Sequence, residues 1–327
     1  MRDSKLRLAR SFFAYRSASI LLVFIGLVVF FAVFSQYRFI SPANIKVLLA
    51  FGSEFTIVAL GIGLLMVCGE FDLSVGSILV FCSFIFIRLF EMGVNLFLAG
   101  FITLGAGALV GFLNGLITTK ARIPSFITTL GTMMLWRGVT LLLSLGRTRP
   151  FDTEVSPLLG SILTGKIGGV IPAQAIWFGA FGLVLGLVLH LHKFGNWVYA
   201  TGDNKEAARA MGINTDRTKT ICFMIVGILC AFVAVMQIVR VSTFSSRAGD
   251  GWELKAIAAS VVGGTSLMGG IGSMVGIFLG ALTISAIENG LVVMRISYFW
   301  TYIVFGLVII SSVLFGLYLE RKRLGRG

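Results

Sequence analysis

Charged residues are scarce in this chain of 327 residues, at 13% of the total, whereas hydrophobic residues make up 57%. Soluble domains average about 25% charged residues. Apolar runs of about 20 residues, the length that a helix needs to cross about 30 Å of hydrocarbon, recur along the whole chain. The scarcity of charge therefore excludes an ordinary soluble domain and predicts a protein whose solvent is the lipid bilayer.

Residues that hold metals or carry covalent chemistry are also few. The four cysteines all lie within apolar runs, and the two histidines, His190 and His192, have no nearby cluster of carboxylates or thiols. No metal-ligand spacing occurs in the sequence. We therefore expect no catalytic residue, no metal site and no cofactor in this chain, and a membrane enzyme is the least favoured class.

The net charge of +13 does not indicate nucleic-acid binding, because the basic residues lie at the ends of apolar segments and form no stripe with interleaved aromatic residues. Five of them precede the first apolar run, as they would in a secretory signal. No small-x-small cleavage site follows that run, so we expect an uncleaved first span.

Ten apolar segments are predicted to cross the membrane, which makes the chain an all-α, polytopic protein with one transmembrane domain over residues 1–327. All five prolines lie between segments or in a first helical turn, where the missing N–H costs little. With the N-terminus inside, internal segments hold sixteen Lys and Arg and external ones ten, which predicts both termini in the cytoplasm. The predicted spans are 18–37, 45–66, 73–90, 94–119, 124–145, 173–192, 218–241, 253–268, 273–294 and 297–319.

Two pairs of similar segments indicate an internal repeat. Residues 114–116 and 122–126 resemble residues 289–291 and 295–299, and upstream the segment 69–73 resembles the segment 249–254. Spans 2–5 are therefore predicted to repeat as spans 7–10. Because five spans separate the copies, the two halves should be inverted, an architecture found in transporters. The alternative is chance similarity between glycine-rich apolar segments.

Spans 3 and 8 are short, begin beside acidic residues and contain glycine, which is the pattern of helices that border a solute path. The alternative for Asp72 and Ser74 is that they only cap span 3. Glycines at four-residue spacing in spans 4 and 9 are attributed to close helix packing. The polar residues predicted to line the path are Asp72, Ser74, Ser77, Asn114, Thr265, Ser266 and Asn289.

Two charged residues lie at matching depth inside predicted spans. Glu54 is about 13 Å of helix rise from the outer end of span 2, and Arg137 is about 12 Å from the outer end of span 5. A charge within the membrane needs a partner or a water-filled cavity, so one hypothesis is that these two side chains form a pair. The alternative is a protonated Glu54 with an Arg137 that extends separately to the surface.

One segment resembles a phosphate-binding loop but lacks an essential residue. Gly160 to Lys166 has the glycines and the lysine, yet position 167 is Ile, so the hydroxyl that would bind magnesium is missing. The segment also lies in a predicted external loop. We therefore expect ATP and Mg to be bound by a separate partner chain.

The long predicted internal loop between spans 6 and 7 carries the signals of a short helix. Asp203 or Asn204 can cap it, Glu206 suits its first turn, and Gly212 can end it. A helix of two turns is too short to be stable alone, which favours docking onto a partner. The alternative is a solvated connection.

Four blocks of sequence follow one another along the chain: Gly69 to Ser77, Ile123 to Thr132, Tyr199 to Asn204 with Ala207 to Arg209 and Gly212-Ile213, and Glu253 to Leu267. In this order the blocks resemble the permeases of the ribose-type ABC sugar importers. The resemblance implies a place in the bacterial inner membrane, a second permease subunit (a homodimer or a paralogue), a cytoplasmic ABC ATPase with two nucleotide-binding domains, and a periplasmic solute-binding protein. One departure concerns residues 70–71, which are Glu-Phe where the family usually has Gly-Ile. The residues that the resemblance places against the ATPase are Gly202, Asp203, Asn204, Ala207, Ala208, Arg209 and Gly212.

The sequence is compatible with two functions. The first is a permease subunit that moves a monosaccharide or related sugar-like solute inward, with the external loop 146–172 as a contact for the binding protein. The second is an ion-coupled secondary transporter of a small polar solute, in which Glu54 or Glu288 would couple the ion.

Overall fold

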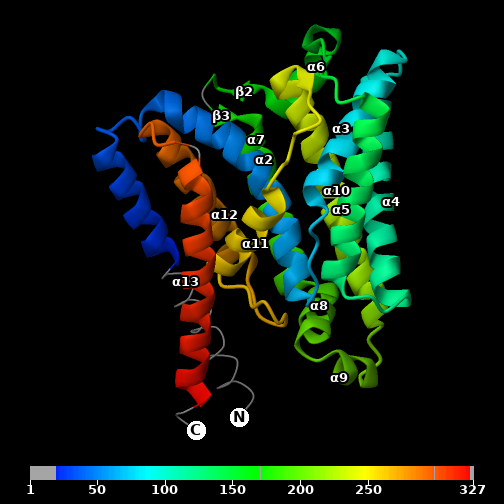
Figure 1. Ribbon diagram of the computed structural model, residues 1–327, viewed down its shortest axis with the longest axis vertical. Coiled ribbons are helices and arrows are strands. Elements are labelled where there is room, and N and C mark those ends of the chain that lie inside the picture. Colours follow the sequence, from blue (N-terminus) through cyan, green and yellow to red (C-terminus); the bar gives the residue numbers. More distant parts are fainter. Residues whose placement is uncertain (1–19, 170, 298, 325–327) are drawn as a thin grey trace.

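The computed structural model describes residues 20–169, 171–297 and 299–324, and these residues fold almost entirely into helices (Figure 1). Each of the ten predicted spans contains a helix, which confirms the all-α membrane fold. The basic residues before residue 20 lie outside the described residues. Six of the described helices are long and apolar enough to cross a membrane: α2 (Pro42–Val67), α4 (Leu96–Lys120), α5 (Ser125–Ser144), α7 (Ala173–Leu191), α10 (Thr215–Val241) and α12 (Met274–Val293). The other apolar helices are Ile20–Phe34, α3 (Val75–Glu91), α11 (Trp252–Val262) and α13 (Phe299–Leu324).

The two ends of the bundle differ. At the α6 end lie α6 (Pro157–Thr164) and a hairpin of β2 (Lys166–Ile167) with β3 (Ile171–Pro172). At the opposite end, here called the α9 end, lie α8 (Lys193–Asp203) and α9 (Lys205–Ala210) (Figure 1). The other short elements are the 3-10 helix Thr153–Val155 and the antiparallel pair of β1 (Arg149–Pro150) with β4 (Thr243–Phe244).

The two halves of the chain use the same order of elements in opposite directions. In the first half, the long helix α2 ends beside α8, an irregular segment of residues 68–74 follows, and α3 then runs away from the α9 end. In the second half, α10 starts from the α9 end, and the segment 242–251 leads back to the start of α11 in the middle of the molecule. We call these segments the first and second breaks.

Span 8 is shorter than the sequence predicts. The expected helix over 253–268 ends at Val262, and residues 263–273 form a loop with five glycines, here called the glycine loop. Gly264, at a φ of +86°, has a backbone conformation that side chains with a Cβ rarely adopt, which explains why the helix stops here. Glycine-rich backbone at this position therefore separates α11 from α12.

The tightest helix contact joins α4 to α10. A Cβ at Gly107 would clash with the carbonyl oxygen of Gly227, and a Cβ at Gly111 would clash with that of Phe223. Farther along α4, a Cβ at Gly115 would lie 2.7 Å from the Cα of Thr220. The glycine spacing therefore serves helix packing, as the sequence predicts, because only hydrogen side chains let the two backbones approach so closely.

Candidate functional site

Three of the residues predicted to line the solute path, Asp72, Ser74 and Asn114, form a buried cluster at the first break. Asp72 accepts hydrogen bonds from the backbone N–H of Ser74 at 2.7 Å and from its hydroxyl at 2.5 Å. Asn114 of α4 donates to Ser74 at 2.9 Å and to Asp72 at 3.3 Å. All three side chains are fully buried. The structure thus brings these predicted residues together in one buried, hydrogen-bonded cluster, in which only the Oδ1 of Asn114 has no hydrogen-bond partner.

The remaining predicted path residues lie elsewhere. Ser77 is buried in the first turns of α3. Asn289 of α12 exchanges hydrogen bonds of 2.7 and 3.0 Å with Asn44 at the start of α2. Thr265, which is buried, and Ser266 belong to the glycine loop, where the Ser266 hydroxyl accepts from the N–H of Met268 at 3.1 Å. Of the seven residues, the structure therefore joins only Asp72, Ser74 and Asn114, and the other four lie at separate places in the fold.

The predicted pair of Glu54 and Arg137 is wrong. Glu54 instead accepts two hydrogen bonds from Arg240 of α10, at 2.6 and 2.9 Å, and the guanidinium lies 3.7 Å from the ring centre of Phe51. The reason is helix arrangement: α2 packs against α10, whereas α5 packs against α3 and α4. Equal depth along two helices does not make those helices neighbours.

Arg137 instead holds the second break. Its guanidinium donates to the carbonyl oxygens of Ser246 at 2.7 Å and Ala248 at 3.4 Å, and it forms an ion pair of 2.7 Å with Asp250. Backbone carbonyls outside regular structure need donors when they lie deep in a membrane protein, and Arg137 supplies them. One side chain of α5 therefore holds residues 246–250 of the second break, while the pairing of β4 with β1 holds its start.

The same helix α5 also holds the first break. The hydroxyl of Ser125 accepts from the N–H of Phe71 at 3.1 Å, and that of Thr129 accepts from the N–H of Leu73 at 3.0 Å. The second break meets the start of α3 where the carbonyl of Gly249 lies against the Cα of Gly76, a position at which any Cβ would clash. One helix thus ties together the irregular segments of both halves.

A three-way backbone contact forms at the α9 end. Gly202, at the end of α8, packs against the carbonyl of Val67, the last residue of α2. The N–H of Gly270 in the glycine loop donates to the same carbonyl at 2.9 Å. Tyr199 of α8 donates to the carbonyl of Gly272 at 2.7 Å. The end of α8 is therefore locked to α2 and to the glycine loop.

The short helix that the sequence predicts in this region is α9. Asn204 caps it by accepting from the N–H of Ala207 at 2.9 Å, and Gly212 follows it with a φ of +82°. Ala208 is buried, while Glu206 is 84% exposed and Met211 82% exposed. The helix therefore packs by one face and leaves the other open.

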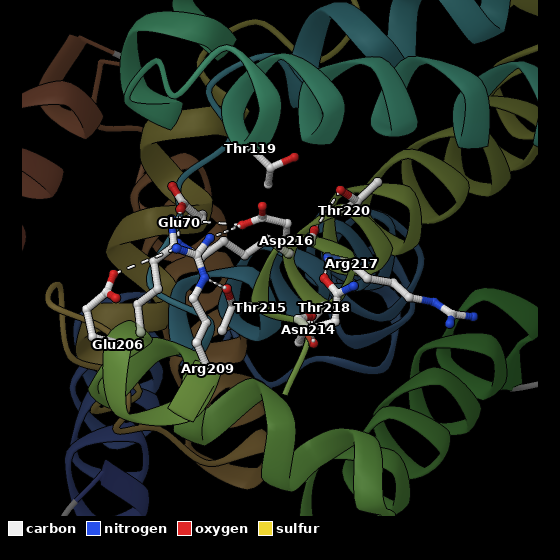
Figure 2. Close-up of polar contacts among 12 residues, drawn as sticks. Glu70, Thr119, Glu206, Arg209, Asn214, Thr215, Asp216, Arg217, Thr218 and Thr220 are labelled. Carbon is white, nitrogen blue, oxygen red and sulfur yellow. Dashed lines mark hydrogen bonds and ion pairs between the residues drawn. The ribbon is translucent and has the colours of Figure 1, made fainter. Parts of the chain in front are cut away.

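Arg209 fixes α9 to the start of α10. Its guanidinium forms an ion pair of 2.7 Å with Asp216 and a hydrogen bond of 2.9 Å with Thr215. Figure 2 shows these side chains converging between the two helices, with Glu70 of the first break nearby. The ion pair between Arg209 and Asp216 therefore connects α9 directly to α10, so a movement of α9 would be transmitted to α10.

The sequence has known relatives over most of its length. The family described as "Branched-chain amino acid transport system / permease component" matches residues 44–313. The chain belongs to this family. It is also 35% identical to the ribose import permease protein RbsC of Escherichia coli strain K12, over 89% of this chain and 91% of the relative. No solved structure matches the fold at a significant level.

Two further relatives carry other names. The chain is 32% identical to the autoinducer 2 import system permease protein LsrC of Photorhabdus luminescens, over 86% of this chain and 83% of the relative. It is 34% identical to the xylose/arabinose import permease protein XylH of Sulfolobus acidocaldarius, over 88% and 82%. The predicted family resemblance is confirmed, and the chain is a multi-pass membrane permease.

Within this family fold, the unusual Glu70 has a partner. Its carboxylate accepts from the ammonium of Lys219 in the first turns of α10, and both side chains are largely buried. The pair joins the first break to α10 next to the Arg209 cluster. Sequence reasoning noticed Glu70 but missed Lys219, and it also missed Arg240, because neither partner is near in sequence. The contact between α5 and the first break has a sign in the sequence, because Ser125 and Thr129 are four residues apart and therefore lie on one side of the helix.

Proposed function

We propose that this chain is the permease subunit of an ATP-driven importer that carries a monosaccharide or a related sugar-like solute across the bacterial inner membrane. The observation that carries the proposal is the match, over 86 to 89% of this chain, to permeases named for ribose, autoinducer 2 and xylose/arabinose import. The family description mentions branched-chain amino acids, but these curated relatives are named for sugars and autoinducer 2. The chain would be a single transmembrane domain without enzymatic activity of its own.

The energy would come from a separate ATPase with two nucleotide-binding domains, which binds ATP and Mg. Support comes from α9, whose exposed face carries Glu206 and Ala207 and is followed by the exposed Met211, while Arg209 fixes the helix to α10. An exposed methionine next to a short capped helix suits a protein contact, because its flexible apolar side chain adapts to a partner surface. In this arrangement Gly202 to Gly212 form the coupling element, and the α9 end faces the cytoplasm.

The opposite end would receive the solute. The segment with α6 and the β2–β3 hairpin exposes apolar residues such as Leu158 and Ile167 at the α6 end, where a periplasmic solute-binding protein would dock. A second permease subunit, a copy of this chain or a paralogue, would complete the path. Both chain termini would then lie in the cytoplasm.

The decisive experiment is reconstitution of the permease in proteoliposomes with the ATPase and the binding protein of the same importer. The proposal predicts that the permease co-purifies with the ATPase and that proteoliposomes accumulate labelled ribose or arabinose only when ATP is enclosed with the ATPase. Uptake that needs no ATPase and collapses with an ionophore would overturn the proposal in favour of an ion-coupled transporter. Two contacts already weigh against that alternative, since Glu54 is paired with Arg240 and Glu288 with Lys255 at 2.7 Å.

A further inference from the structure

One ion pair is exposed at a depth where lipid would normally lie. The Asp250 side chain is 59% exposed and that of Arg137 is 21% exposed. By contrast, the Asp72 cluster that the sequence places on the path is fully buried and hydrogen-bonded within itself. An exposed charged pair is therefore the feature that the proposed function leaves unexplained.

The depth of this pair follows from the two helices beside it. Arg137 precedes the last residue of α5 by seven residues, about 10 Å of rise. The second break touches the start of α3 at Gly76, and α3 then runs for a further fifteen residues, about 22 Å, toward the α6 end. The pair thus lies between about 10 and 22 Å from the α6 end, within a hydrocarbon layer of about 30 Å.

Lipid contact at this depth is unfavourable for both groups. A carboxylate or guanidinium inside a membrane faces the interior of a bundle or a water-filled cavity, because contact with hydrocarbon is too costly. Irregular backbone, such as the second break that carries Asp250, is likewise tolerated at membrane depth only when it is buried in protein or lines a cavity. The exposed side of Asp250 therefore faces water or a second protein chain, and not hydrocarbon.

We propose that Arg137 and Asp250 line the solute path where it crosses the middle of the membrane. This inference rests on the proposed function. The guanidinium offers N–H donors and the carboxylate offers acceptors, a combination that matches the hydroxyl groups of a neutral polyhydroxylated solute. Because Arg137 also holds the carbonyls of Ser246 and Ala248, solute contact at the pair would act directly on the course of the second break.

Cysteine accessibility in the complete reconstituted complex tests the inference. Asp250→Cys should react with a water-soluble, membrane-impermeant cationic thiol reagent, and saturating solute during ATP turnover should slow the reaction. Leu135→Cys is the matched control: Leu135 lies two residues from Arg137, about 3 Å in rise, but on another flank of α5, and is 56% exposed. The four native cysteines are buried. We expect the variant at 250 to react at least about tenfold faster than the control, since only the former borders water.

A second variant guards against a folding defect. Ser246→Cys leaves the backbone carbonyl that Arg137 binds unchanged, so it should fold even where Asp250→Cys does not, and it should react like the variant at 250. Equal, slow labelling of positions 246 and 135 in a complex that still takes up sugar with ATP would overturn the inference alone. A wild-type complex without ATP-dependent uptake would instead refute the proposed function.

Discussion

At the scale of single residues, buried charges decide which helices are joined. Glu54 and Arg240 connect α2 to α10, and Glu70 and Lys219 connect the first break to the same helix. When one charge of a buried pair is removed, the other stays in a low-dielectric interior where no water can solvate it, and the fold is destabilised. These pairs therefore act as fixed points for the helices that surround the breaks.

The Glu54 pair gives the first prediction. Glu54→Gln should lower the thermal unfolding midpoint in detergent strongly, corresponding to about 3–5 kcal/mol, because Arg240 keeps its charge without a counter-ion. Glu206→Gln is the control: Glu206 is exposed and lies 3.7 Å from Arg209, so its loss should cost less than about 1 kcal/mol. Equal midpoints for both variants would mean that the pair with Arg240 does not stabilise the fold.

The residue scale also marks where sequence reasoning stops. The sequence identifies Glu54, Arg137 and Glu70 as unusual, because a charge inside an apolar run is visible without a structure. It does not identify their partners. The depth of a residue in the membrane follows from counting residues along its helix. Which other helix the residue faces depends on how the whole bundle packs. In the structure Glu54 faces α10, and Arg137 faces the second break.

At the scale of helices, backbone contact between α4 and α10 holds the halves together. The spacing of Gly107, Gly111 and Gly115 was enough to predict a packing face, since small residues four apart fall on one side of a helix. The identity of α10 as the partner was not predictable. Association in lipid relies on such close fit, because lipid is as apolar as the side chains that it replaces.

A pair of alanine substitutions on α4 tests this contact. Gly111→Ala should destabilise the permease by about 1–3 kcal/mol, because the new methyl group meets the backbone of Phe223 and the helices must separate. Gly105→Ala, on the same helix with open space around it, should leave stability unchanged or slightly raised. Detergent unfolding compares them, and a Gly111→Ala protein as stable as the Gly105→Ala protein would contradict the packing account.

Helix α8 is one of the elements that the sequence did not predict. Gly195, Asn196, Thr201 and Gly202 have weak helix propensity, so residues 193–203 read as part of a loop. In the structure Phe194 and Val198 are buried, and packing supplies the stability that propensity lacks. α9 was predictable for the opposite reason, since its cap and its first turn are local signals.

At the scale of the whole molecule, the end of α8 connects the open face of α9 to both halves. Gly202 touches the end of α2, and the glycine loop bonds to the same carbonyl of Val67. Two packed arrangements of such contacts, rather than gradual bending, are what a switching permease needs. We therefore expect a movement of α9 to reach the two breaks through this contact of Gly202 with Val67 and the glycine loop, here called the α8 joint.

A methyl group at this joint should uncouple the transporter. Gly202→Ala places a Cβ against the carbonyl of Val67 and the N–H of Gly270, so α8 must shift away from α2. We expect uptake to fall about tenfold or more, equivalent to about 1.4 kcal/mol at the coupling step, while the ATPase still binds and hydrolyses ATP. Gly179→Ala, in open space on α7, is the control and should retain uptake. Normal uptake by Gly202→Ala would show that this joint does not transmit movement.

The most direct test of the account is the sidedness of α9, because an ATP-driven permease must present this helix to the cytoplasm. Met211→Cys, at an 82% exposed position beside α9, and Ile167→Cys, at an exposed position of the β2–β3 hairpin, place one thiol at each end of the molecule. An impermeant thiol reagent should label position 167 in cells with a permeable outer membrane, and position 211 only in inverted vesicles. Labelling of position 211 from outside the cell would contradict the account.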